Sequence, residues 1–574
     1  MNSTLKRNRS RRGALVTALL CALMLCSTVP ATGQKAALTT DERAALERVS
    51  ADSLRGHLSF ISSDALEGRN TPSRGLDLAA EYIAAQFRRA GLEPAGDDNY
   101  FQTANWSQSA RDMRDFELKI ASGAGETRFD GGQSSIGLNF MGRSLWSPDG
   151  ALALSGAGVV KVDYKDAAAL SSLTTEAVAG KVVLTQIPDF RREDRSRWME
   201  LYGAEDAFMR RMGALGATLV VSADAAPMTA RDAAAPRLFD PENKDAPSSR
   251  TVAASSPAAG AGSSSGAGGA SSPASPAASA SRGGAVDVEP AAAPLIIVHG
   301  TPASKIYDEL KTGGATLTVN LHAPQDTPVR VRNVAGVLRG SDPTLKDTYV
   351  IVSAHYDHLG VREGSEGDRI FNGANDDGSG TVGVVELASV LSTLKVRPKR
   401  SILFMTFFGE EKGLLGSRYY GRHPLVPLRA TVAQINLEQI GRTDDSEGPQ
   451  VGTLAMTGLD YSDVGGVLVA AGETAGVKVF KHPAKSDAYF GRSDNQALAD
   501  VGIPAHTVSV AFDFPDYHAV GDEWQKIDYA NMSKVVRAVG AGLLLVAGNA
   551  QAPKWNEANV KTARYVQAWK ELHR

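Results

Sequence analysis

Apolar positions recur every three to four residues through positions 40–96 of this chain. The spacing is clear in 54–64 (LRGHLSFISSD) and in 75–92 (GLDLAAEYIAAQFRRAGL). Such a period places the apolar side chains on one face of an α-helix. We therefore expect amphipathic helices in this part of the chain.

From about residue 115 to 223 the pattern changes to short apolar runs separated by turns. The runs 116–122 (FELKIAS), 156–164 (GAGVVKVDY) and 180–188 (GKVVLTQIP) are typical of strands. A helix is expected at 206–217 (DAFMRRMGALGA). This stretch therefore predicts a β-rich unit.

After about residue 326 strand-like and helix-like segments alternate. A helix is predicted over 379–395 (SGTVGVVELASVLSTLK). Nearly continuous apolar strands that alternate with helices predict an α/β domain whose sheet is covered on both faces. In such sheets the functional site lies at the carboxyl ends of the strands. The predicted strands are 333–340, 347–360, 400–409, 431–441 and 503–510.

Composition bounds the number of domains and the kind of partner. The chain has 574 residues, 43% of them hydrophobic, and a net charge of −3. Two or three domains are expected at this length, and the charge gives no reason to expect nucleic acid as a partner. Residues 245–290 are dominated by Ala, Ser, Gly and Pro, which predicts a flexible insertion, because such a segment cannot bury a core.

The first residues resemble an export signal. A basic stretch precedes the apolar run 13–29, and small residues follow at 31–34. We expect cleavage after Gly33, export to the periplasm or the outside, and no stable membrane span afterwards; a membrane anchor and lipid attachment at Cys21 or Cys26 are alternatives. Because these are the two cysteines of the chain, the cleaved form would bind metal through His, Asp and Glu.

Polar clusters follow the predicted strands. His355 is a plausible zinc ligand, and Asp357 could accept its second ring N–H, although the two could also form a structural pair. Asp376 and Asp377 fit either a site or a helix cap. The clusters are His355, Asp357 and His358; Asp376 and Asp377; Glu410 and Glu411; Glu438; Tyr517 and His518.

The two adjacent glutamates, Glu410 and Glu411, follow a buried strand and precede a helix that we expect to start close to Glu411. A helix N-terminus favours negative charge, and neighbouring side chains diverge, so one carboxylate can bind a metal while the other faces its water. Histidines and carboxylates after separate strands would supply two zinc ions that share a bridging carboxylate. Glu410 is then the spare carboxylate that can act as the base.

These motifs resemble, in order and spacing, the co-catalytic zinc exopeptidases, a family that includes secreted bacterial aminopeptidases, glutamate carboxypeptidase II, the transferrin receptor and glutaminyl cyclase. The resemblance covers about residues 327–535 and the N-terminal stretch 61–87. It implies an α/β fold with a mixed central sheet covered by helices on both faces and an inserted β-rich protease-associated domain. The implied division is a signal peptide at 1–33, the peptidase domain at 34–114 and 326–574, and the inserted domain at 115–325.

The family pattern also implies the role of each residue. Two zinc ions per chain would be bound by five ligands, and Asp376 would bridge both ions. Glu410 would be the general base, Asp357 would orient His355, and Tyr517 would either stabilise the oxyanion or pack beside His518. Glu438 stands where many members carry Asp, and Asn495 where many carry His. The implied ligands are His355, Asp376, Glu411, Glu438 and His518.

The leading hypothesis is an aminopeptidase that removes N-terminal residues from peptides. A carboxypeptidase or dipeptidase of the same family is the alternative, with Arg442, Lys485 or Arg492 as the cation for a substrate carboxylate. A binding module that has lost its metals is a third, less favoured hypothesis, since every ligand position is filled.

Overall fold

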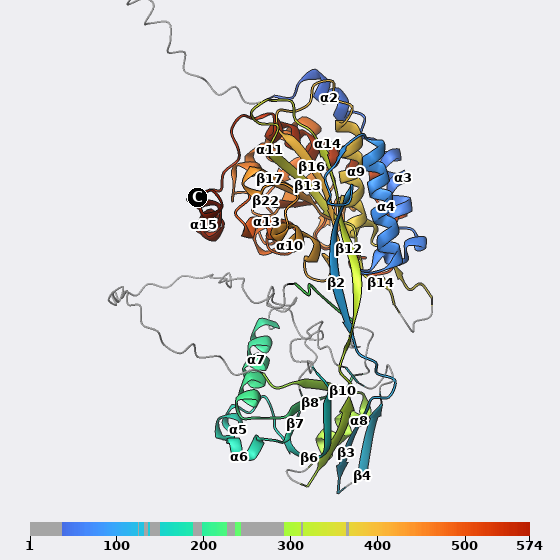
Figure 1. The fold of residues 1–574 in the computed structure, drawn as a ribbon, viewed down its shortest axis with the longest axis vertical. Coiled ribbons are helices and arrows are strands. Elements are labelled where there is room, and N and C mark those ends of the chain that lie inside the picture. Colours follow the sequence, from blue (N-terminus) through green and yellow to red (C-terminus); the bar gives the residue numbers. More distant parts are fainter. Residues whose placement is uncertain are drawn as a thin grey trace, which may run out of the picture.

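The computed structural model describes residues 37–123, 125–130, 136–137, 150–186, 198–226, 236–242, 292–310, 314–362 and 367–574. The predicted signal peptide and the insertion at 245–290 lie outside these residues. Figure 1 shows two units, an α/β unit and a β-rich unit, with strands β2 (Phe101–Ala110) and β12 (Gln325–Leu338) running from the first toward the second.

The predicted N-terminal helices are present. They are α2 (Thr40–Leu46), α3 (Ala51–Ile61) and α4 (Arg74–Arg89). Each begins after a hydroxyl residue whose side chain accepts a hydrogen bond from a first-turn N–H, which satisfies a donor that the helix leaves unpaired. The apolar faces of these helices pack into the main core.

The main sheet is mixed, as predicted. Its central strands β16, β13, β17 and β22 are parallel neighbours, whereas β12 pairs with β16 and with β2 in antiparallel fashion. The carboxyl ends of the four parallel strands therefore meet at one edge of the sheet. The order is β21 (Lys478–Phe480), β20 (Thr453–Met456), β22 (Ala505–Ser509), β17 (Thr431–Leu437), β13 (Tyr349–His355), β16 (Ser401–Phe407), β12, β2 and β9 (Arg237–Phe239), with β1 (Glu93–Pro94) beside β12.

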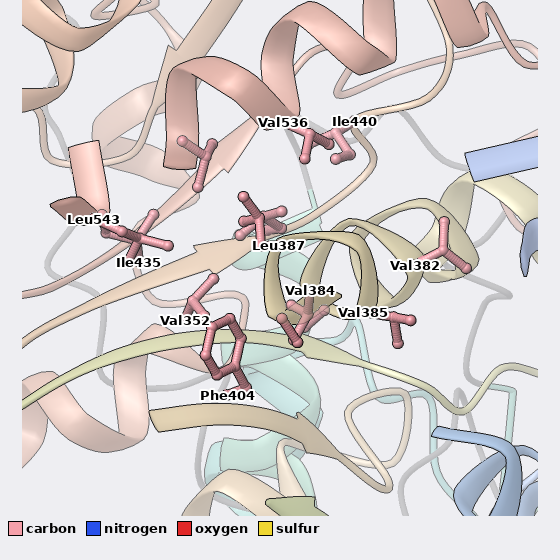
Figure 2. Packing of buried hydrophobic residues seen from close by; sticks show 14 of the residues in the cluster. Val352, Val382, Val384, Val385, Leu387, Phe404, Ile435, Ile440, Val536 and Leu543 are labelled. Atoms are coloured by element: carbon pink, nitrogen blue, oxygen red, sulfur yellow. The ribbon is translucent and has the colours of Figure 1, made fainter. Parts of the chain in front are cut away.

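Helices cover both faces of this sheet, which explains the nearly continuous apolar strands. On one face Val352, Phe404 and Ile435 pack against α9 (Gly380–Leu391) and α14 (Tyr529–Gly548), as Figure 2 shows. Alternate strand residues face the opposite layer, which comprises α10 (Leu415–Arg422), α13 (Asn495–Asp500) and α15 (Ala563–Leu572).

A second sheet forms the β-rich unit. Its β6, β7, β8 and β10 are parallel, and β3, β4 and β11 pair in antiparallel fashion. We propose that this unit is the inserted protease-associated domain. Its strands are β3 (Glu117–Ser122), β4 (Gly125–Asp130), β5 (Ile136–Gly137), β6 (Leu152–Lys161), β7 (Val182–Thr185), β8 (Leu219–Asp224), β10 (Leu295–His299) and β11 (Thr316–Leu321), and its helices are α5 (Ala167–Ser172), α6 (Thr175–Val178), α7 (Trp198–Ala214) and α8 (Thr301–Glu309).

One helix in the described part of the chain, α14, is long and apolar enough to cross a bilayer. Of its most apolar window, 78% is buried inside the fold. It packs against α11 (Asp463–Ala475) and α9. The apolar character of α14 is therefore accounted for by its position in the core.

Candidate metal centre

The carboxyl edge of the sheet collects the predicted site residues. His355 is the last residue of β13, and the two glutamates Glu410 and Glu411 follow β16. Glu438 follows β17, and His518 lies in the loop after β22. This confirms that the polar clusters converge at one edge of the sheet.

Asp376 reaches the same place from the loop before α9. The loop spans Ala374–Ser379, and the backbone N–H groups of Asn375 and Asp376 donate to the carboxylate of Asp522 at 2.9–3.0 Å. Asp377 Oδ1 accepts from the N–H of Gly380, the first residue of α9, at 3.0 Å and from the N–H of Gln439 at 3.1 Å. The two adjacent aspartates therefore have different roles. Asp377 binds the start of the helix, and Asp376 faces the cluster.

The carboxylate of Asp376 lies between two histidines. Its Oδ1 is 3.3 Å from Nε2 of His355, and its Oδ2 is 3.1 Å from Nε2 of His518. On the His355 side, Glu438 Oε1 lies 3.4 Å from the same Nε2. On the His518 side, Glu411 Oε2 lies 3.2 Å from that ring. The arrangement is two His–carboxylate clusters that share Asp376.

A further histidine, His358, contacts the second cluster. Its Nδ1 lies 2.7 Å from Oε1 of Glu411, on the opposite carboxylate oxygen from His518. His358 is fully buried. Sequence reasoning gave this residue no role, although it stands in the same motif as His355.

The helix after Glu411 begins later than expected. The segment from Glu410 to Leu414 is a turn, closed by the N–H of Leu414 on the carbonyl of Glu410, and α10 starts at Leu415. Gly409, Gly413 and Leu414 all have positive φ, which interrupts a helical path. The prediction that a helix dipole stabilises the negative charge of Glu411 is therefore wrong. His358 and His518, which contact its carboxylate, stabilise that charge instead.

Asp357 holds two strand ends together. The His355 ring nitrogen Nδ1 lies 3.2 Å from the main-chain oxygen of Asp357 and 3.5 Å from its Oδ1. The same Oδ1 accepts a 3.1 Å hydrogen bond from the N–H of Glu410. We expected the carboxylate to orient the ring; the structure adds the carbonyl as the nearer acceptor.

Charge is concentrated in this cluster. Burial raises the pKa of Asp376, but contacts with His355 and His518 outweigh it and hold that pKa well below its usual value. Burial and the Asp376 charge oppose ionisation of Glu411, yet the contacts with His358 and His518 lower its pKa to about 2. Burial, with the charge of Glu438, raises the pKa of Glu410. Glu410, beside the cluster, is therefore a stronger base than Asp376 and Glu411 within it.

Tyr517 packs beside His518, which is one of the two roles considered for it from the sequence. Its ring stacks on that of His518, with centroids 4.0 Å apart and an interplanar angle of 21°. Burial and the charges of Asp376 and Glu411 raise its pKa above the usual 10, so the hydroxyl stays protonated. The structure therefore shows the packing of Tyr517 on His518, and the Tyr517 hydroxyl can still donate a hydrogen bond.

The segment with Asn495 serves the pocket wall. Ser493 donates to Oε2 of Glu438. The Asn495 side chain donates to the carbonyl of Phe490 and accepts from the hydroxyl of Thr507, so it is a structural residue.

Arg69 is a further supporting residue that sequence reasoning missed. Its fully buried guanidinium donates to main-chain oxygens of Tyr356, Ile61, Asn372 and Gly373 at 2.5–2.9 Å. It therefore ties the N-terminal helices to the loops that carry His355 and Asp376. In the sequence, Arg69 and Asn70 form a polar pair between two helices. Such a pair is equally typical of an ordinary surface turn.

The donor set fits divalent zinc. Two groups, His355, Asp376 and Glu438, and His358, Asp376 and Glu411, each place their ligand atoms within 4.8 Å of one another, and Nε2 of His518 lies 3.1–3.2 Å from Asp376 and Glu411 in the second group. Imidazole and carboxylate are zinc ligands, and buried acids this close repel unless cations lie among them. A cavity of about 190 Å³ opens onto the cluster.

The α/β fold carries two His–carboxylate clusters of the kind that two-metal hydrolases use. Residues 333–542 match the model of Peptidase family M28. The resemblance to co-catalytic zinc exopeptidases is thereby confirmed. The aminopeptidase from Aneurinibacillus sp. strain AM-1 is similar in fold, with a TM-score of 0.51 and 18% identity over 90% of this chain and 98% of that chain.

Fungal proteins are similar over a shorter stretch. A probable zinc metalloprotease of Pyrenophora teres f. teres is 34% identical over 122 residues, 21% of this chain and 25% of the relative. A vacuolar membrane protease of Phaeosphaeria nodorum is 34% identical over 120 residues, 21% of this chain and 10% of the relative. The chain thus matches about a quarter or less of these relatives' length.

The predicted localisation is corrected by this comparison. We expected a chain exported to the periplasm or the outside, but several of the relatives are vacuolar membrane proteases by name. The expectation rested on residues 1–34, whose basic and apolar pattern is common to export signals and to anchors at other membranes.

Proposed function

We propose that this chain is an aminopeptidase that uses two zinc ions and a glutamate base to remove N-terminal residues from peptides. The observation that carries the proposal is the position of Asp376, whose two oxygens face His355 and His518 at 3.3 and 3.1 Å. One carboxylate between two histidine clusters is the arrangement that a pair of metal ions requires.

The proposed ligands divide into two sets that share Asp376. His355 and Glu438 complete the first, and Glu411 and His518 complete the second. When bound, the two ions would polarise the scissile carbonyl and lower the pKa of a water molecule. His358 would hold the carboxylate of Glu411 from its other oxygen, as residues behind a ligand commonly do.

Glu410 is the proposed general base. It lines the cavity together with Asp376, Glu411, Glu438 and His518, so it reaches the space where a water molecule would attack. Burial raises the pKa of Glu410 above its usual value, which makes its carboxylate a better proton acceptor. Glu410 would accept the water's proton and return it to the leaving nitrogen as the peptide C–N bond breaks.

The acidic lining supports recognition of a free amino terminus. Acidic side chains line the cavity, Glu410 and Glu438 among them, and carboxylates near the metals can bind an ammonium group. A cavity of about 190 Å³ is small beside the ~300–1,000 Å³ of drug-sized sites. The end of a peptide suits it better than the middle of one.

The test is a set of matched substrates with purified, zinc-loaded protein. Leucine arylamide should be hydrolysed, and a chelator should abolish the activity. An N-acetylated leucine arylamide should be stable. Hydrolysis of a blocked peptide only at its free C-terminus would move the assignment to the alternative carboxypeptidase, and hydrolysis of the acetylated arylamide alone would contradict an aminopeptidase.

A further inference from the structure

Three cations near the cavity differ in what they bind. Arg442 donates to Asp444 and Asp516, and its side chain is buried. Lys485 is also buried and contacts three carboxylates at 2.8–3.5 Å. These two positive charges are neutralised within the fold, so neither is available to a substrate.

Arg492 is different. It is exposed and lines the cavity with Glu410 and Glu438. Across the described residues, no acceptor or carboxylate pairs with its guanidinium. Arg492 is therefore a cation at the rim of the cavity whose charge no described protein group neutralises, so it is available to a ligand.

The guanidinium of Arg492 is nevertheless held in place. Its Cζ lies 4.6 Å from the ring centroid of Tyr489, and that ring packs edge-on against Phe512 at 5.3 Å. Stacking fixes the plane of the group and leaves its N–H edge free. The next residue, Ser493, donates to Glu438, which fixes the distance between Arg492 and the metal cluster.

We propose that Arg492 is a specificity-determining residue that binds a carboxylate of the substrate at the rim of the cavity. This inference rests on the proposed function. A planar guanidinium with a free edge takes a carboxylate through two parallel hydrogen bonds. The preferred substrates are therefore short peptides with a carboxylate close to the scissile bond.

That carboxylate has two possible sources, the C-terminus of a dipeptide or an acidic side chain. Four substrates separate them: Leu-Ala, Leu-Ala-amide, Leu-Glu-amide and Glu-Ala-amide. The first carries a terminal carboxylate, the second carries none, and the others carry one on the second or the first residue.

The variant is Arg492→Gln, and the matched control is Arg429→Gln, an exposed arginine in the turn Leu428–Ala430 that does not line the cavity. We expect Arg492→Gln to lower kcat/KM at least tenfold, mainly through KM, for whichever substrate carries the bound carboxylate. Leu-Ala-amide should change less than twofold, and the control should match the parent. Equal effects on all four substrates, or no effect on any, would overturn the proposal.

A binding measurement keeps this test separate from the proposed function. In the zinc-loaded Glu410→Gln background, calorimetry with Leu-Ala, Leu-Glu-amide, Glu-Ala-amide and Leu-Ala-amide should show at least tenfold tighter binding of one carboxylate-bearing ligand than of Leu-Ala-amide. Adding Arg492→Gln should remove that difference. If the parent hydrolyses leucine arylamide but this preference is absent, the inference about Arg492 fails and the peptidase proposal stands. If the preference is present but the parent protein hydrolyses no substrate with a free amino terminus, the peptidase proposal fails instead.

Discussion

The backbone N–H of Glu410 donates a 3.1 Å hydrogen bond to Oδ1 of Asp357, and that oxygen lies 3.5 Å from Nδ1 of His355. One carboxylate therefore links the turn that carries the proposed base to the ring of a proposed zinc ligand. The two strands concerned, β13 and β16, are parallel neighbours. The spacing between base and metal is thus set by the sheet and by this one side chain.

Asp357→Asn should weaken zinc binding without unfolding the chain. Asparagine keeps the oxygen that accepts from Glu410 but removes the negative charge behind His355. We expect metal affinity or kcat/KM to fall ~10–100-fold, the usual effect of changing a residue behind a ligand. Competition with a chromogenic chelator measures the affinity, and parental values for both quantities would contradict this role.

Tyr517→Phe separates the two roles considered for Tyr517. Phenylalanine keeps the ring that stacks on His518 and removes only the hydroxyl. If the hydroxyl stabilises the oxyanion, kcat should fall by ~10²–10³ while zinc content stays the same. An unchanged kcat would leave Tyr517 as a packing residue.

Arg69→Met should destabilise the peptidase unit. The substitution leaves four main-chain acceptors without their donor and removes a buried cation beside acids. The expected loss is about 3–5 kcal/mol of unfolding free energy, as for other broken buried charge networks. Denaturant unfolding of the zinc-loaded protein measures it, with Arg429→Met as the exposed control; equal stability of the two variants would exclude this role.

His506 should make stability depend on pH below neutrality. Burial lowers its pKa to about 4, whereas an unfolded histidine titrates near ~6.5. Between these values the unfolded chain binds a proton that the folded chain does not, so stability is lost as pH falls from about 6.5 to about 4, by roughly 3 kcal/mol in full.

The measurement is Tm against pH for the parent, His506→Gln and the exposed control His322→Gln. His506→Gln should show a shallower decline than the other two between pH 7 and 4, although its Tm at pH 7 is lower because contacts with Ser462 and Thr457 are lost. Parallel curves for all three proteins would show that His506 does not titrate in this range.

The sequence predicted the sheet and the convergence of the site residues because both follow from strong local patterns. Apolar strands bounded by polar residues predict where His355 and Glu438 lie. The turn between Glu410 and α10 was missed, since positive φ at Gly409, Gly413 and Leu414 is a backbone property that the letters GEEKGLLG do not settle. The support from Arg69 was missed because three of its four partners are main-chain oxygens far away in sequence.

The His358 contact escaped prediction for a related reason. A histidine three residues after His355 could face either side of an irregular loop, and only the tertiary fold brings it to 2.7 Å from Glu411. Asp522, which holds the Asp376 loop, lies more than a hundred residues away from it. Residues that support a site through distant backbone leave little trace in a local pattern.

The division of labour between the two adjacent glutamates tests the account most directly. Purified Glu410→Gln and Glu411→Gln should be compared for zinc content by mass spectrometry and for hydrolysis of leucine arylamide. We predict that Glu410→Gln retains the parental zinc content while kcat falls ~10²–10⁴-fold, as expected for a lost general base, and that Glu411→Gln loses zinc as well as activity. Full activity of Glu410→Gln, or parental zinc content in Glu411→Gln, would contradict the mechanism.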